Sequence, residues 1–246
     1  MIKLRKIEKP DELEKNEITL TKKYRKTKGA VWQKEYITNA LNDLSYGKYA
    51  YCEKCDKLEV EHFICRHKRP DKVVDWENLL PVCHTCNNNK SDHDCEAEPI
   101  INPRADNPKE HLIYDHYRFY PRGGDIKGRR TITYLNLNDT AKTREKRENI
   151  FLDVEKAINA CRDKYKLLST SKELKLEKEE LRKLVIEMFR YIRCENEFSA
   201  LYATEILAHP LYPELKKELK ASKVWNEKIT QLEKNAIMIS LSKNNS

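Results

Sequence analysis

The sequence contains little glycine, with five residues in a chain of 246, and it has no long apolar run. Scarce glycine beside abundant lysine and glutamate argues against a turn-dense β protein and favours a helix-rich one. Three of the first six residues, Met1 to Lys6, are charged. We therefore expect neither a signal peptide nor a membrane-spanning segment, and the sequence predicts a cytoplasmic protein with no membrane partner.

Neither sign of charge dominates the chain. Its 48 basic and 40 acidic residues give a formal net charge of +8. This excess is moderate, so it only weakly favours an anionic partner such as nucleic acid. The chain also has eight cysteines. In a reducing compartment they argue against a disulfide framework and for metal binding by the paired ones.

Four of the cysteines form two Cys-x-x-Cys pairs, with residues 56–82 between the pairs. A turn of this kind directs two sulfurs toward one metal ion at about 2.3 Å, and a second turn completes a tetrahedron. The spacing therefore predicts a structural Zn²⁺ site. The alternative, a redox pair, requires a thioredoxin-like βαβ context that the sequence lacks. The predicted zinc ligands are Cys52, Cys55, Cys83 and Cys86.

The apolar pattern predicts an α+β fold with a small zinc-bound core and a largely helical remainder. The core is expected to be a hairpin over residues 48–64 followed by a helix over 87–91. A unit this small needs metal binding to supply folding energy. We expect one domain over 1–138 and a helical, partner-docking region over 139–246. Other expected elements are a basic, irregular arm over 1–29, helices over 31–46, 140–168 and 174–195, and two or three short helices broken at Pro210 and Pro213.

Polar residues between and after the cysteines have the chemistry needed to hydrolyse a phosphodiester. A neutral histidine, His62, suits the deprotonation of water near pH 7. The Glu61 carboxylate and the Asn87 amide oxygen are hard ligands suited to Mg²⁺ or Mn²⁺. Adjacent strand residues point to opposite faces. Glu61 and His62 can therefore serve one site only if the strand ends or bends there.

Three segments resemble the ββα-metal core of HNH endonucleases with paired zinc-binding cysteines: Glu61-His62, Trp76-x-Asn78-Leu79 and Cys86-Asn87-x-x-Lys90. The resemblance implies that His62 is the general base and that Glu61 and Asn87 hold the catalytic ion. It also implies that Asn78 fixes the loop that carries His62. The sequence departs from the commonest pattern at two positions. Glu61 stands where Asp is usual, and Asn87 stands where His is usual.

A wider resemblance covers roughly residues 1 to 160. Val60-Glu61-His62-Phe63, Asp75-Trp76-Glu77-Asn78-Leu79, Ile101-Asn102-Pro103, Thr131-Ile132 with Leu137-Asn138, and a helix bearing Arg144 and Arg147 together resemble the PtuB nucleases of the Septu anti-phage system and their retron-associated relatives. This resemblance implies an ABC/SMC-like ATPase partner of the PtuA type. The ββα-metal element implies DNA, chiefly double-stranded, as the substrate.

For several residues the sequence leaves two interpretations open. Arg66, Lys68 and Lys90 either contact phosphates or are ordinary surface charges. Asn87 is alternatively a helix cap, and His93 is an additional candidate metal ligand. The basic run 22–28 either binds a partner or is a disordered tail. The alternative function is a non-catalytic zinc-ribbon subunit that binds nucleic acid or acts as an adaptor.

Overall fold

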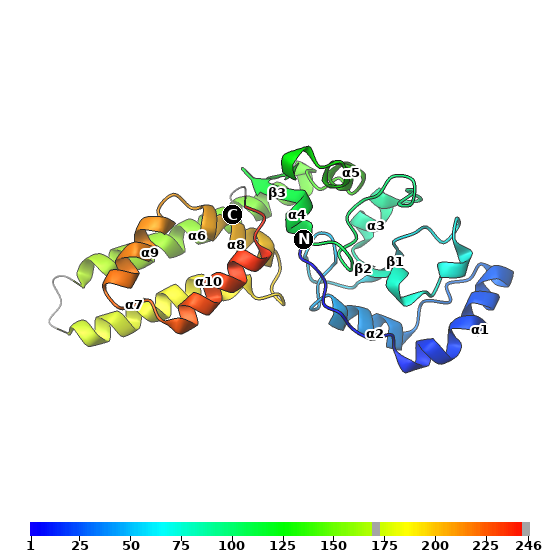
Figure 1. Cartoon of the computed structure of the whole chain (residues 1–246), viewed down its shortest axis with the longest axis horizontal. Coiled ribbons are helices and arrows are strands. Elements are labelled where there is room, and N and C mark those ends of the chain that lie inside the picture. The colour runs from blue at the N-terminus through cyan, green and yellow to red at the C-terminus, as the bar shows by residue number, and fades with distance from the viewer. Residues whose placement is uncertain (169–172, 243–246) are drawn as a thin grey trace. The chain divides into compact units, whose positions relative to one another are not determined.

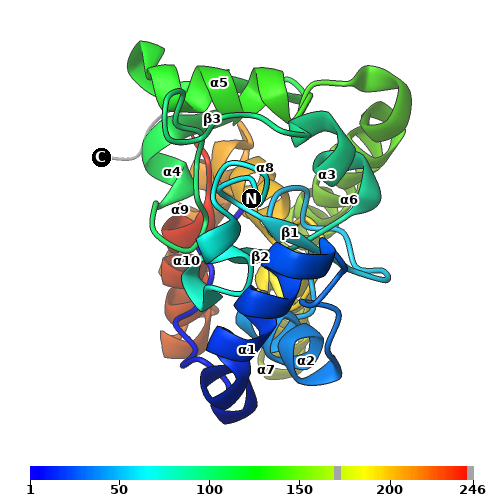
Figure 2. The ribbon, with the colours of Figure 1, turned by 90° about the vertical axis from the view of Figure 1, so that its right-hand side faces the viewer.

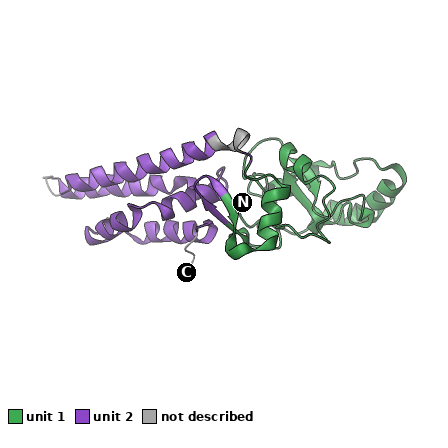
Figure 3. Ribbon diagram, turned by 90° about the horizontal axis from the view of Figure 1, so that it is seen from above, with its two compact units in different colours: residues 1–112, 119–138 green, residues 113–118, 139–246 purple. Residues whose placement is uncertain are grey.

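The computed structural model describes residues 1–168 and 173–242, and for residues 140–144 it describes the backbone only. Helices predominate, with two separate two-stranded sheets (Figure 1). Two compact units, coloured separately in Figure 3, comprise residues 1–112 with 119–138, and residues 113–118 with 139–246. The short segment 113–118 thus belongs to the second unit rather than to the first domain expected from the sequence. No helix in the described part of the chain combines the length and apolar character needed to cross a membrane.

A two-stranded antiparallel sheet and one short helix form the centre of the first unit. Strand β1 (Glu59–His62) pairs with β2 (Leu79–Val82), with His62 opposite Leu79, and α3 (His84–Lys90) follows almost directly. The order strand, strand, helix agrees with the expectation. The hairpin expected over 48–64 is wrong, because that segment holds only β1. The partner strand lies beyond residues 63–78, and every residue of β2 is buried.

The outer edge of β2 is occupied by a loop residue and a proline. The Ala50 amide donates to the Pro81 carbonyl at 2.8 Å. Because the N–H and C=O groups of one strand residue point to the same side, the N–H that Pro81 lacks would also have faced away from β1. Pro81 therefore costs the β1–β2 pairing no hydrogen bond, as expected for proline at a sheet edge.

The N-terminal segment is helical, where an irregular arm was expected. Helix α1 (Asp11–Thr27) has acidic residues in its first turn and basic residues in its last, which suits the helix dipole. Only Leu13, Leu20 and Tyr24 are buried on it, so its apolar signal is weak. Helix α2 (Glu35–Leu44) follows and packs on β2, and α1 packs against α2 (Figure 2) and the 3₁₀ turn over Pro70–Lys72.

Short elements make up the rest of the first unit and the segment 113–118 of the second. Helix α5 (Ile126–Tyr134) includes Gly128, where a Cβ would collide with the His111 carbonyl oxygen, so only glycine fits there. A two-residue turn at His116 and Tyr117, both with positive φ, joins β3 to β4, as a type I′ hairpin requires. These elements are α4 (Pro108–His111), β3 (Leu112–Asp115), β4 (Arg118–Pro121) and α5 (Ile126–Tyr134).

Five helices form the second unit around one apolar cluster. Helix α7 ends at Met188, because a 3₁₀ turn over Arg190–Ile192 replaces the last part of the expected helix. The helices are interrupted at Pro210, as expected, whereas Pro213 lies in the first turn of the helix over Tyr212–Ala221 and does not break it. Arg147 donates to the Tyr117 carbonyl at 2.8 Å, whereas the Arg144 side chain lies outside the described residues. The helices are α6 (Thr140–Leu167), α7 (Leu174–Met188), α8 (Ser199–Ala208), α9 (Tyr212–Ala221) and α10 (Glu227–Ile239).

Candidate active site

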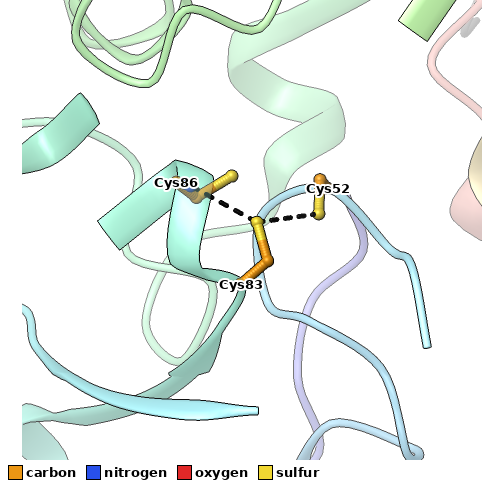
Figure 4. A group of neighbouring side chains, drawn as sticks. All are labelled: Cys52, Cys83 and Cys86. Atoms are coloured by element: carbon orange, nitrogen blue, oxygen red, sulfur yellow. Dashed lines mark hydrogen bonds between the residues drawn. The ribbon is translucent and has the colours of Figure 1, made fainter. Parts of the chain in front are cut away.

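Three cysteines meet at the start of α3. The Sγ atoms of Cys52, Cys83 and Cys86 all lie within 4.8 Å of one another, and those of Cys52 and Cys83 are 3.7 Å apart (Figure 4). Cys83 caps α3 by accepting the Cys86 N–H at 3.3 Å, so the helix start itself fixes two of the sulfurs. The hydrogen bond from the Cys52 thiol lowers the pKa of Cys83. Clustered thiols with one favoured as thiolate fit a shared soft metal ion.

The fourth predicted zinc ligand lies apart from this group. Cys55 is exposed and does not belong to the set of sulfurs within 4.8 Å. Between the two cysteines of its pair, Glu53 takes a left-handed conformation, with φ of 60°. Three of the four predicted ligands are therefore brought together, and Cys55 as the fourth stays a prediction.

His62 ends β1 and is almost fully buried, with 3% of its surface exposed. Its Nε2 lies 2.8 Å from the Val73 carbonyl oxygen. A carbonyl only accepts, so Nε2 carries the proton and Nδ1 is the basic nitrogen. Within the described residues Nδ1 has no hydrogen-bond partner. Burial lowers the pKa of His62 to about 4, which keeps the ring neutral at pH 7.

An aromatic side chain that sequence reasoning missed holds the His62 ring from the other side. Trp32, between α1 and α2, meets His62 edge to face with ring centroids 4.6 Å apart. Tyr24 on α1 meets Trp32 in the same manner at 5.9 Å. No spacing in the sequence links these residues, because their proximity depends on how α1 and α2 pack.

Asn78 lies directly before β2 and fastens the loop that follows His62. Its Oδ1 accepts the Ile64 N–H at 2.7 Å, and its Nδ2 donates to the Ile64 and Lys72 carbonyls at 3.1 and 3.0 Å. The Phe63 N–H also donates to the Asn78 carbonyl at 2.8 Å. The Lys72 carbonyl that the Asn78 amide binds lies one residue before Val73, whose carbonyl binds His62. These contacts agree with the loop-fixing role expected of Asn78.

Glu61 and Lys90 form a buried ion pair between β1 and α3. Lys90 Nζ lies 2.5 Å from Glu61 Oε1 and 3.1 Å from the His62 carbonyl oxygen. Burial raises the pKa of Glu61, and the Lys90 ammonium opposes that shift. Lys90 is 2% exposed. The residue expected to contact phosphate at the surface thus lies in the interior, with its charge directed at Glu61.

Asn87, one turn before Lys90, engages a different carboxylate. Its Nδ2 donates to Glu59 Oε2 at 2.8 Å. Glu59 Oε1 in turn lies 2.8 Å from His84 Nδ1. Sequence reasoning missed Glu59, although strand alternation places it on the same face of β1 as Glu61 and thus toward α3. Asn87 lies inside α3 and does not cap it, because the capping residue is Cys83.

A cleft of about 830 Å³ opens beside this face of the first unit. Arg66 reaches it with its guanidinium 5.0 Å above the Trp32 ring. The cleft walls carry cations and carboxylates in similar number, so charge alone does not select an anionic ligand. Its lining includes Trp32, Lys34, Glu35, Asp56, Lys57, Glu59, Arg66 and Asn87.

Two further candidates from the sequence are engaged elsewhere. Lys68 is exposed and pairs with Asp94 at 2.5 Å. His93 has its Nε2 2.7 Å from the Glu98 carbonyl oxygen and its ring 3.7 Å from that of Tyr134. These contacts engage Nε2 and one face of the ring, and a metal-ligand role for His93 stays a prediction.

The predicted ligands of a divalent ion fit that ion by chemistry. Glu61 Oε2 is buried and has no hydrogen-bond donor among the described residues, which is costly for a carboxylate unless a cation or proton is nearby. The Asn87 contact uses its nitrogen, so its oxygen is the atom that would bind the predicted ion. A carboxylate and an amide oxygen form a donor set suited to Mg²⁺ or Mn²⁺.

Comparison with known proteins gives one informative relative. The chain is 31% identical, over 256 aligned positions, to a Septu protein PtuB of Bacillus thuringiensis, and the alignment covers 96% of this chain and 93% of the relative. No protein-family model and no solved structure matches the chain. The likeness extends through both compact units, whereas the resemblance seen in the sequence was confined to roughly residues 1 to 160.

Proposed function

Because the chain belongs to the PtuB family of Septu proteins, we propose that it is a metal-dependent HNH endonuclease that hydrolyses phosphodiester bonds of DNA. The observation that carries the proposal is the arrangement of His62. One ring nitrogen is held by a backbone carbonyl, and the other is left as an unpartnered base. This is the tautomer that a general base acting through Nδ1 needs.

The chain's own residues would divide the work of hydrolysis. His62 Nδ1 accepts a proton from the attacking water, while the Val73 carbonyl keeps the second nitrogen protonated. Asn78 holds the loop after His62 in place through the Ile64 carbonyl and also binds the Lys72 carbonyl, one residue before Val73. Proton transfer by a positioned side chain of this kind contributes about 10²- to 10⁴-fold to a rate.

Two metals complete the proposal. Glu61 and Asn87 would hold Mg²⁺ or Mn²⁺. When bound, that ion supplies charge stabilisation at the scissile phosphate. Cys52, Cys83 and Cys86, with Cys55 as the fourth ligand, would hold a structural Zn²⁺ that fixes the start of α3 relative to the loop before β1.

The proposed partners follow from family membership. Double-stranded DNA is the proposed substrate, and a PtuA-like ATPase of the ABC/SMC type is the proposed protein partner in anti-phage defence. The second unit is the proposed docking region. Leu174, Leu176 and Leu184 on α7 are between 37% and 49% exposed, so they offer apolar surface to a partner.

The nuclease assignment is tested on plasmid DNA with Mg²⁺ or Mn²⁺, with and without the co-expressed ATPase. His62→Ala should cut at least about 100-fold more slowly than wild type. His67→Ala, an exposed histidine five residues later, serves as the matched control. If wild type cuts under none of these conditions, or His62→Ala cuts as fast as wild type, the nuclease proposal fails.

Partner docking is tested by co-purification of the full chain with the ATPase. Leu176→Glu, on α7, should reduce capture of the ATPase at least severalfold. Ile126→Glu changes a residue that is 64% exposed in the first unit, so it is the control. Equal capture by both variants would argue against docking through this part of α7.

A second candidate function is a non-catalytic zinc-ribbon subunit. It is favoured by the Glu61–Lys90 ion pair, which already satisfies one oxygen of the carboxylate expected to hold the catalytic ion. This candidate predicts that wild type and His62→Ala bind DNA equally and that neither cuts it. The same plasmid assay, run beside a gel-shift measurement, separates the two functions.

A further inference from the structure

We propose that Glu59 is a positioning residue that sets the amide orientation of Asn87 and thereby presents the Asn87 oxygen to a divalent cation. This inference rests on the proposed function, because it takes Asn87 as a ligand of the ion. It adds a residue outside the predicted set, and it assigns that residue a role in metal affinity rather than in proton transfer.

Glu59 and Glu61, both on β1, contact α3 at different positions. Glu59 and Glu61 are two residues apart on β1, so both side chains face α3. They meet different turns of that helix. Glu61 contacts Lys90 at 2.5 Å, whereas Glu59 contacts Asn87 at 2.8 Å. Of the two carboxylates, only Glu59 lines the cleft, and Asn87 lines it too.

The two ends of the Asn87 amide bind different kinds of partner. Its nitrogen only donates and its oxygen only accepts, and a hard cation binds the oxygen alone. An ionised carboxylate cannot donate a hydrogen bond, so the Glu59 contact is compatible with one amide orientation only. In that orientation Asn87 Nδ2 faces Glu59 and Oδ1 points elsewhere. Without Glu59 the amide is free to present either end.

Glu59 is itself held in place by His84 on α3. His84 donates from Nδ1 to Glu59 Oε1, and its Nε2 accepts from Asn88 Nδ2, both at 2.8 Å. His84 and Asn88 are four residues apart on α3 and therefore neighbours on its surface. One oxygen of the Glu59 carboxylate thus accepts a hydrogen bond from His84, and the other accepts one from Asn87. Such supporting contacts commonly tune metal affinity by about 10- to 100-fold.

The test measures Mn²⁺ binding to the full zinc-loaded chain by electron paramagnetic resonance, with no DNA present. Glu59→Ala should weaken binding about tenfold or more. Glu59→Gln should retain much of the affinity, because its amide oxygen still accepts from Asn87. Glu35→Ala is the matched control, since Glu35 is an exposed carboxylate on the same cleft. It should bind within about twofold of wild type, the scatter expected when no contact to a ligand changes.

The same substitution in an Asn87→Asp background distinguishes an effect of Glu59 on the Asn87 amide orientation from an effect of the Glu59 charge. In Asn87→Asp the two terminal oxygens are equivalent, so there is no amide to orient. Adding Glu59→Ala to Asn87→Asp should then cost no further Mn²⁺ affinity. If the same loss appears in both backgrounds, Glu59 acts as a ligand or through its charge, and the positioning role is overturned.

The remaining outcomes are equally decisive. Wild-type affinity in Glu59→Ala, or an equal loss in Glu35→Ala, overturns the inference while leaving the nuclease proposal intact. If wild type binds no Mn²⁺, both fail together. If Mn²⁺ binding behaves as expected but His62→Ala still cuts DNA, the proposed catalytic role of His62 fails and the role of Glu59 stands.

Discussion

The Lys90 ammonium lies 2.5 Å from the Glu61 carboxylate, and both side chains are at least 96% removed from solvent, with 2% and 4% exposed. Removing one member of such a pair leaves the other buried and unpaired. Lys90→Met should therefore lower the free energy of unfolding by about 3 to 5 kcal/mol, as judged from urea denaturation of the zinc-loaded protein.

Two controls belong with that measurement. The double variant Glu61→Met with Lys90→Met removes both charges and should recover most of the loss. Lys68→Met removes an exposed cation from its pair with Asp94 and should cost less than about 1 kcal/mol. A loss in Lys90→Met no larger than that in Lys68→Met would mean that the buried pair carries little of the stability.

The Asn78 amide makes three hydrogen bonds to the backbone, two as a donor. Asn78→Asp keeps the acceptor for Ile64 and replaces the donor by an oxygen that faces two carbonyls. Repulsion between that oxygen and the two carbonyls should move the side chain away from the Ile64 N–H, so we expect a loss of about 2 to 4 kcal/mol and faster amide hydrogen exchange at Ile64. Asn16→Asp on the exposed face of α1 should change stability by less than about 0.5 kcal/mol. Unchanged exchange at Ile64 would contradict the loop-fixing role.

Zinc content tests the position of Cys55. If Cys55 completes the site, Cys55→Ser and Cys83→Ser should both lose most of the bound zinc and unfold at lower temperature, because structural zinc contributes folding energy directly. Cys194→Ala, in the second unit, should keep one zinc ion per chain. Full zinc content in Cys55→Ser would show that three sulfurs with another ligand suffice. Elemental analysis after gel filtration gives the stoichiometry.

Glu205 on α8 makes stability depend on pH. Burial, with the Asp115 carboxylate adding to it, raises its pKa from 4.5 to about 7. Between about pH 4.5 and pH 7, the folded protein therefore keeps a proton on Glu205 that the unfolded chain has already released. The free energy of unfolding should fall across that window, by roughly 2 to 3 kcal/mol, and level off above it.

Replacing the acid with its amide isolates this effect. Glu205→Gln should flatten the fall between pH 4.5 and pH 7 and should be more stable than wild type at pH 8. Glu195→Gln, an exposed glutamate in the same unit, should reproduce the wild-type profile. Denaturation at a series of pH values measures both. A Glu205→Gln profile parallel to wild type would assign the pH dependence to other groups.

Local patterns in the sequence predicted local structure well. The second Cys-x-x-Cys pair lies at the start of α3, where Cys83 and Cys86 meet. The periodicity over 31–46 predicted α2 with an error of four residues at its start. The same reasoning missed α1, since only three of its residues are buried. The acidic first turn and basic last turn of that helix were the available signal.

Pairings between distant segments were harder to predict. The partner of β1 lies beyond a 16-residue connection, and nothing in the apolar pattern distinguishes it from a nearby hairpin. Lys90 was placed at the surface because lysine is seldom buried without a partner, and the partner was identified only by the contact between β1 and α3. Glu59 and Trp32 became visible for the same reason, once α2, β1 and α3 were packed together.

Pro81 has a consequence for how the protein behaves at high concentration. A two-stranded sheet normally leaves the outer edge of each strand able to pair with another molecule, which promotes aggregation. On β2 that edge offers a carbonyl already used by Ala50 and a proline nitrogen that cannot donate. Strand addition from a second copy is therefore blocked at this position on β2.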